Sequence, residues 1–182
     1  MARLEAEARK KLESIELVAD AMIRAVFRAN GNTRTIDSAL DSLAMQAGQY
    51  LNSNEELGET FTVMAQQALS LDLPPHKPPR KPFHWPLEFA EVFQRENCGF
   101  DAMVGNPPFL GGQKLSGALG GDVRDWFVNV LAAGTRGSAD LVAYFFLRAQ
   151  ALLNDAGTLG LIATNTVAQG DTRAVGLDRM AS

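Results

Sequence analysis

The sequence predicts an α/β protein that begins with an all-α segment. Two apolar runs, at residues 101–105 and 158–164, are typical of buried strands, and a helical pattern lies between them. This order predicts a parallel pair of strands joined by a helical crossover. Before these runs, apolar residues recur at steps of three and four, which predicts helices. The chain has 182 residues, enough for one domain with an extension.

Three helices are expected within residues 1–70, which we interpret as a structural segment. The first covers residues 2–29 and the second residues 35–48. The third follows Ser53 and Glu56, whose spacing is that of a capping box. The residues expected on the apolar stripe of the first helix are Leu4, Ala8, Leu12, Ile15, Ala19, Met22 and Val26.

Residues 71–98 are predicted to be an extended connector, since residues 72–82 hold five of the chain's eight prolines. His84 has no carboxylate or cysteine at catalytic spacing, so we expect a packed, hydrogen-bonded histidine. Trp85, Phe89 and Phe93 are expected to anchor the connector to the sheet. Cys98 is expected to be buried or half-buried.

The composition restricts the function classes. The net charge of −4 does not suggest a basic DNA-binding surface, so a basic surface is expected in a partner or in another part of the protein. With one cysteine, the chain can form no internal disulfide and shows no zinc motif. No metal site is expected. The absence of a signal peptide or an apolar run of membrane-spanning length predicts a cytoplasmic protein.

The segment with most chemical content is the end of the first predicted strand, Asn106, Pro107, Pro108 and Phe109. Proline lacks an N–H and fixes φ, so the strand must stop there in a rigid corner. The Asn106 side-chain oxygen and the Pro107 carbonyl could both accept from an exocyclic amino group. Phe109 could stack on its ring. A plain strand-to-loop turn is the alternative, because proline pairs mark turns in many proteins.

Three segments resemble the adenine-N6 DNA methyltransferases of large restriction–modification and phage-defence systems. Residues 100–109 are similar to the motif IV of these enzymes. Residues 82–93 resemble the lead-in to that motif, and residues 160–173 resemble the strand and loop that follow it. The segments occur in the same order as in that family, and the similarity covers about residues 80–180.

The resemblance implies a fragment of a Rossmann-like class I methyltransferase fold, with S-adenosylmethionine as methyl donor and double-stranded DNA as substrate. It implies catalytic roles for the four corner residues, 106–109. The start of the helix expected at residues 138–154 matches motif V, which implies cofactor contacts for Asp140, Leu141 and Phe145. The implied substrate contacts are Gln113, Lys114, Thr164, Asn165 and Gln169.

Residues 99–182 are therefore interpreted as a partial catalytic domain. The Gly-rich cofactor loop that this family needs does not occur in the sequence. We expect the missing remainder and a target-recognition domain as partners, and we expect the chain to be inactive alone. Two alternatives stay open: a non-catalytic remnant or interaction module, and a methyltransferase acting on RNA or on a protein amide nitrogen.

The predicted catalytic part contains three further elements. The glycine-rich residues 110–121 are expected to form a loop too flexible for the core, either a mobile lid or an ordinary disordered loop. Helices are expected at residues 122–133 and 138–154, with Ser138 as the N-cap of the second. The residues of the first of these helices expected to point inward are Val123, Trp126, Phe127 and Val130. Gly157 is expected to end the turn before the second strand.

Overall fold

The computed structural model describes residues 2–29, 31–52, 56–73 and 75–181. The chain divides into two compact units, residues 1–87 and residues 88–182, and each is described by itself. Throughout the described residues, no helix is both long enough and apolar enough to cross a membrane.

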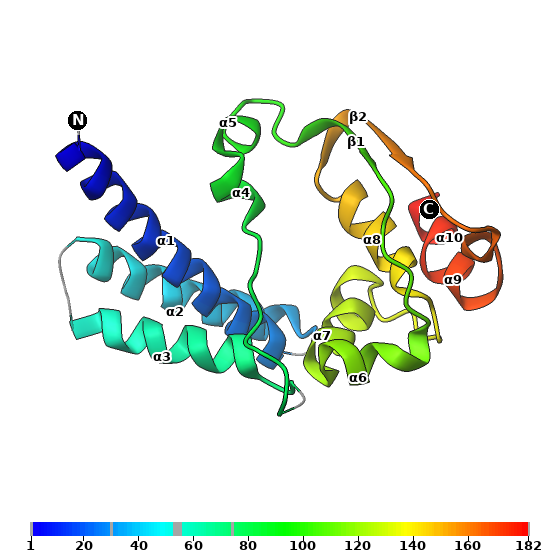
Figure 1. Cartoon of the computed structure of the whole chain (residues 1–182), viewed down its shortest axis with the longest axis horizontal. Helices are drawn as coiled ribbons and strands as arrows, with labels where there is room; N and C mark the ends of the chain where they lie inside the picture. Colours follow the sequence, from blue (N-terminus) through cyan, green and yellow to red (C-terminus); the bar gives the residue numbers. More distant parts are fainter. Residues whose placement is uncertain (1, 30, 53–55, 74, 182) are drawn as a thin grey trace. The chain divides into compact units, whose positions relative to one another are not determined.

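The first unit is built from three helices, α1 (Ala2–Ala29), α2 (Thr33–Leu51) and α3 (Glu56–Ser70), as Figure 1 shows. The three predicted helices are therefore confirmed. Asn32 caps α2, because its side-chain oxygen accepts from the Thr35 amide at 3.1 Å. The capping box proposed at Ser53 lies outside the described residues.

The face of α1 that enters the core differs from the predicted stripe. Leu12, Ile15 and Met22 are exposed, while Ala21 is fully buried. Leu17, Val18 and Ala25 pack around the same cluster, which includes Leu43 and Phe61 of the other two helices. The prediction of the stripe was wrong because α1 is apolar on more than one side, so its periodicity fits two faces. Leu4 and Ala8 also belong to the predicted stripe, but their side chains are not among those that the structure describes.

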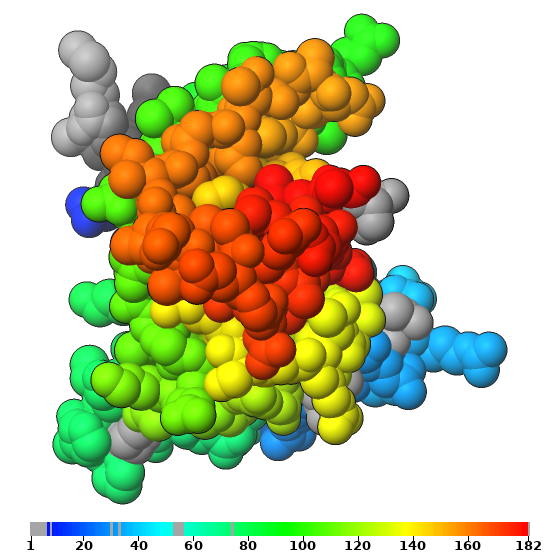
Figure 2. All heavy atoms as spheres, turned by 90° about the vertical axis from the view of Figure 1, so that its right-hand side faces the viewer, coloured from blue at the N-terminus to red at the C-terminus, as the bar shows by residue number. Residues whose placement is uncertain are grey.

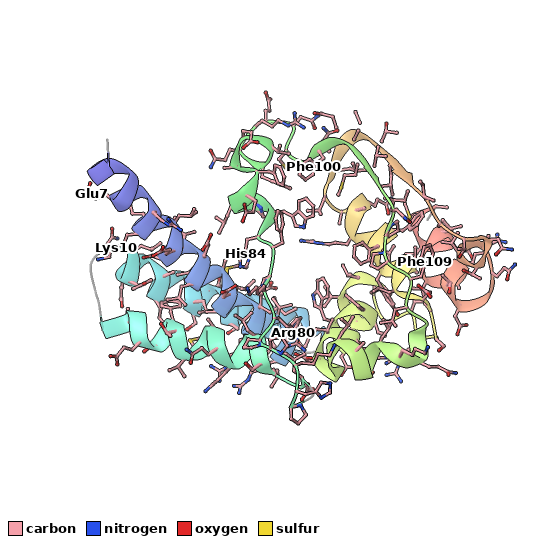
Figure 3. All side chains as sticks on the ribbon, viewed as in Figure 1. Glu7, Lys10, Arg80, His84, Phe100 and Phe109 are labelled. Carbon is pink, nitrogen blue, oxygen red and sulfur yellow. The ribbon has the colours of Figure 1, made fainter. Side chains whose placement is uncertain are left out.

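The connector after α3 contains two short helices, α4 (Trp85–Glu88) and α5 (Ala90–Phe93). His84 is half-buried, and its Nε2 lies 2.8 Å from Oδ1 of Asp20 on α1. The expectation of a hydrogen-bonded structural histidine is confirmed. Figure 3 labels His84, and also Arg80, whose backbone N–H donates to the Leu69 carbonyl at 2.8 Å.

The second unit contains a two-stranded parallel sheet of β1 (Phe100–Gly105) and β2 (Leu153–Leu161), with Val104 paired to Gly160. The predicted parallel pair is confirmed. Phe89 and Phe93 pack edge-on against Phe100, with ring centroids 5.2 and 5.5 Å away, so they anchor the lead-in to β1 as predicted. The third predicted anchor, Trp85, packs edge-on against Phe83, with ring centroids 4.9 Å apart. Along the sequence, the elements between the two strands are η1 (Gly112–Lys114), α6 (Leu115–Leu119), α7 (Gly121–Trp126), the π-helical turn η2 (Phe127–Leu131) and α8 (Leu141–Gln150). The elements that follow β2 are η3 (Asn165–Ala168), α9 (Gly170–Val175) and α10 (Leu177–Met180).

β1 is not the buried strand that its apolar sequence suggested. Val104 is 86% exposed, and Ile162, just beyond β2, is 70% exposed. α8 packs against β2, and the face of the sheet that carries Val104 is open to solvent. The prediction failed because an apolar composition shows only that a strand can be buried. The burial itself requires a layer of other elements over that face of the sheet.

Residues 112–119 of the glycine-rich segment are helical and contribute to the core, so the prediction of a loop outside the core was wrong. Leu115, at the start of α6, is only 1% exposed and packs in the core with Tyr144 and Val175. Leu110 and Leu119 pack against the same core. The leucines therefore fix this segment despite its glycines.

Five smaller predictions also need correction. The N-cap of α8 is Asp140, not Ser138, and the helix ends at Gln150. The π-helical turn η2 shifts the face of its helix, so Val130 is exposed while Val128 is buried. Gly157 lies within β2 rather than before it, and Cys98 is exposed.

Candidate functional site

Asn106 lies at the edge of the sheet where both strands end. The Ile162 amide donates to the Gly105 carbonyl at 2.9 Å, so the last residues of β1 and the residues just after β2 are adjacent. Asn106 begins the segment after β1, and Thr164 and Asn165 begin the segment after β2. In open α/β sheets this carboxyl edge is where ligands bind.

The four corner residues differ in exposure. Asn106 is exposed, and its side chain makes no hydrogen bond within the part of the chain that the structure describes. Pro107 is buried, Pro108 is exposed, and Phe109 is 43% exposed. Figure 3 labels Phe109 on the segment that follows β1. The corner thus combines a fixed proline with an amide and an aromatic ring that are both accessible to a ligand.

Asp140 holds the chain directly after Phe109. Its Oδ1 accepts from the Leu110 amide at 3.1 Å and from the Val142 amide, in the first turn of α8, at 3.0 Å. In return, the Leu141 amide donates to the Leu110 carbonyl at 2.9 Å. One carboxylate oxygen therefore caps a helix and fixes the end of the Asn-Pro-Pro-Phe corner at the same time.

The first turn of α9 holds the other side of the Asp140 segment. The Ser138 amide donates to Oδ2 of Asp171 at 2.6 Å, and the Asp140 amide donates to Oγ1 of Thr172 at 3.1 Å. Gly170, which precedes them, has a φ of +51°, a conformation that favours glycine. The corner, the start of α8 and the start of α9 are thus joined by hydrogen bonds.

Two glycines permit the close approach of these segments. A Cβ on Gly112 would lie 2.4 Å from the carbonyl carbon of Ser138. A Cβ on Gly137 would lie 2.9 Å from the Asp171 carboxyl carbon. Glycine is required at position 112 because backbone occupies the space of a side chain, whereas a Cβ at position 137 would displace the Asp171 carboxylate.

The proposed cofactor contacts lie on α8 and at its N-cap. Leu141 is buried in the core, and Oδ1 of Asp140 is engaged as described. Phe145 is 43% exposed and lines an apolar cavity of about 190 Å³. The other residues that line this cavity are Trp126, Phe127, Leu131, Tyr144 and Arg148. Burial raises the pKa of Tyr144, whose ring stacks on Phe127 at 4.8 Å between centroids.

The proposed substrate contacts fall into two groups, and all of them are exposed. Gln113 and Lys114 lie in η1. Thr164, Asn165 and Gln169 lie at or next to η3, and the hydroxyl of Thr164 is 2.7 Å from that of Thr166. Figure 2 shows β2 and the helices after it, coloured orange to red, as one continuous surface. All five side chains are accessible to a large substrate.

The start of β1 has its own anchor. Asp101 accepts from Arg95 through both carboxylate oxygens, at 3.0 and 2.9 Å, and from the side-chain amide of the buried Asn154 at 2.6 Å. The hydrogen bonds from Arg95 and Asn154 hold the pKa of Asp101 below its usual value. Because Asn154 lies in β2, this cluster ties the beginnings of the two strands together.

The described residues contain no group of three or more histidine, cysteine, aspartate or glutamate side chains placed to bind a metal ion. The residues that sequence analysis missed are Gly112, Asp171 and Thr172. A signal was available for the last two, since a Gly-Asp-Thr turn at a helix start offers side-chain acceptors. Gly112 carries no such signal among so many glycines.

Comparison with known proteins identifies the family. Residues 26–180 match the family model described as Eco57I restriction-modification methylase. No curated protein and no solved structure matches the chain significantly. The matched region contains the whole carboxyl edge of the sheet, with Asn106, Asp140 and Asp171. The chain belongs to the Eco57I restriction-modification methylase family.

Proposed function

We propose that this chain supplies the target-base half of a site-specific DNA methyltransferase that modifies adenine at N6. One observation carries the proposal: the Asn106 amide is exposed and makes no hydrogen bond among the described residues, at the carboxyl edge of a parallel strand pair. A buried proline and an exposed phenylalanine follow it. Family membership supports a methyltransferase acting on DNA.

The chemistry of the corner suits an exocyclic amino group. The Asn106 oxygen and the Pro107 carbonyl accept from the two N6 hydrogens, and Phe109 stacks on the adenine ring. Two acceptors orient the amino group so that its lone pair points at the methyl carbon. Extruding the base from the duplex costs a few kcal/mol, which these contacts offset.

S-adenosylmethionine supplies an electrophilic methyl group bound to sulfur. Methyl transfer would replace that C–S bond by a bond to N6 with loss of one N6 proton, and Asn106 and the Pro107 carbonyl would hold N6 in place for it. The residues of this chain then act mainly by positioning. The cavity beside Phe145 is apolar, and its volume of about 190 Å³ suits a flat aromatic ring such as the adenine of the cofactor. Phe145 would stack on that ring, with Asp140 and Leu141 supporting the helix that carries it.

On the DNA side, Gln113 and Lys114 would contact one flank of the extruded base, and Thr164, Asn165 and Gln169 the other. Because the net charge of the chain is negative, we expect other parts of the methyltransferase, including a target-recognition domain, to make most phosphate contacts. The sequence contains no Gly-rich cofactor turn after a strand, so we expect a partner segment to supply it.

The test is methyl transfer by the complete enzyme with Asn106→Ala. The variant should lose activity, because the amino group loses an acceptor in the transition state. Asn97→Ala is the matched control, since Asn97 is an exposed asparagine of the same unit, outside the site. Wild-type turnover by the Asn106 variant would refute the assignment.

The absent cofactor turn favours a second candidate, a non-catalytic remnant or interaction module. Mixing the chain with the cofactor-binding part of a methylase of the same family separates the two. Restored methylation indicates a split enzyme. A folded mixture without methylation favours the non-catalytic remnant. Methylation of RNA or of a protein amide instead of DNA would favour the other alternative, a methyltransferase with one of these substrates.

A further inference from the structure

We propose that Asp140 is a positioning residue for the target-base corner, and that Asp171 and Thr172 hold Asp140 in place. This inference rests on the proposed function, because it assigns the task of holding Asn106 and Phe109 ready for a base. It gives Asp140 a role on the target-base side, in place of the cofactor contact that the family resemblance implied.

The contact between Asp140 and the corner is direct and local. Oδ1 of Asp140 accepts from the amide of Leu110, the residue directly after Phe109. The Leu110 carbonyl accepts from the Leu141 amide, so both polar backbone groups of Leu110 are bonded to the start of α8. Since Pro107 and Pro108 already restrict φ, these two bonds fix the far end of a short and stiff segment.

The geometry of Asp140 also shows why this residue type is needed. The same oxygen caps α8 through the Val142 amide at 3.0 Å. An alanine would leave two backbone donors, Leu110 and Val142, without their acceptor. An asparagine would keep an oxygen in the same place, so it should serve both donors nearly as well.

A second layer fixes the backbone on either side of Asp140. The Asp140 amide donates to the Thr172 hydroxyl, and the Ser138 amide donates to the Asp171 carboxylate. These two acceptors follow directly after the loop of Thr164 and Gln169, which we propose contacts DNA. Movement of that loop on DNA binding would therefore be transmitted to the corner by two successive sets of hydrogen bonds, first those of Asp171 and Thr172 and then that of Asp140.

The first readout is amide hydrogen exchange by NMR on the 182-residue chain. In Asp140→Ala the Leu110 and Val142 amides should exchange about tenfold faster or more, because local opening no longer breaks a hydrogen bond. Asp140→Asn should restore protection. Asn32→Ala, which removes the equivalent cap of α2, is the matched control and should leave Leu110 unchanged. Unchanged exchange at Leu110 in Asp140→Ala would overturn the proposal.

The second readout is the affinity of the corner for adenosine, followed through the Asn106 side-chain amide signals. Asp140→Ala should weaken adenosine binding about tenfold, while Asp140→Asn and Asn32→Ala should bind like wild type. Undiminished adenosine affinity in Asp140→Ala would overturn the positioning role even if exchange has changed. If the wild-type chain gave no adenosine response, the proposed base site would fail, and the exchange data alone would decide whether Asp140 holds the corner.

Discussion

Gly112 and Ser138 approach so closely that no side chain fits between them. A Cβ on Gly112 would lie 2.4 Å from the carbonyl carbon of Ser138 and 2.5 Å from its oxygen. Both obstacles are backbone atoms of the segment that leads to Asp140, and that segment cannot move without breaking the bonds to Asp171 and Thr172. This contact sets how near the corner and α8 can lie.

The first prediction concerns this contact. Gly112→Ala should lower the free energy of unfolding by about 1–3 kcal/mol, the usual cost of overpacking, and should shift the NMR signals of Leu110. Gly111→Ala is the matched control, because a Cβ there meets nothing within 4 Å and φ is −53°. Equal stability of the two variants in urea unfolding would show that the approach is looser than the structure indicates.

The second prediction concerns Asp101. The hydrogen bonds from Arg95 and Asn154 lower its pKa in the folded chain, so the folded state binds its proton less readily than the unfolded state. Its contribution to stability is therefore present above the unfolded pKa of about 3.9, and it is lost as pH falls through the folded pKa. Urea midpoints measured from pH 7 downwards should fall less steeply in Asp101→Asn than in wild type.

Arg95→Met provides a separate check on the cause. Without the guanidinium, the pKa of the Asp101 carboxyl group should rise towards its ordinary value, as followed by NMR titration. An unchanged pKa would mean that Asn154, and not Arg95, sets the protonation of this carboxylate.

The third prediction concerns the first unit. His84 Nε2 and Asp20 Oδ1 lie 2.8 Å apart, and both side chains are mostly shielded, at 18% and 23% exposure. A double-mutant cycle with His84→Ala and Asp20→Ala should give a coupling energy of about 1 kcal/mol in unfolding experiments. Strictly additive effects of the two substitutions would contradict a stabilising contact.

The fourth prediction concerns the cofactor. Calorimetric titration of the folded chain with S-adenosylmethionine should give no saturable binding, because the Gly-rich turn that holds this cofactor in the resembled family does not occur in the sequence. Circular dichroism provides the control that the sample is folded. Saturable binding would mean that the residues here described as structural form a cofactor site of their own.

The sequence allowed several elements to be predicted because their signals are local. The three N-terminal helices follow from apolar periodicity, and the parallel strand pair follows from two apolar runs around a helix. The packing of Phe89 and Phe93 against the sheet could be predicted because two large apolar rings lie just before the first strand. His84 was assigned a structural role because no catalytic partner lies at a suitable spacing.

The failed predictions all depended on tertiary context. The buried face of α1 could not be chosen because Leu12 and Leu17 fit alternative stripes of the same helix. The exposure of Val104 depends on which layer covers the sheet, and local sequence cannot show that. Asp140, and not Ser138, is the N-cap of α8. The Asp140 carboxylate accepts from two backbone amides, and one of them, at Leu110, lies 30 positions away in the sequence.

The residue types at the site were clearer from sequence than their connections. The Asn-Pro-Pro-Phe corner stands out because two prolines stop a strand beside an amide and an aromatic ring. The network from Asp171 and Thr172 through Asp140 to Leu110 joins positions far apart in the chain. Such long-range hydrogen bonds leave no periodic signal, so only the folded structure shows them.

The most direct test of the central claim is the identity of the methylated base. The complete enzyme is incubated with DNA and S-adenosylmethionine that carries a deuterated methyl group, and the digested nucleosides are analysed by mass spectrometry. The account predicts deuterated N6-methyladenine with wild type and none with Asn106→Ala. Label on cytosine, or equal label on adenine in both proteins, would contradict the claim that Asn106 receives the adenine amino group.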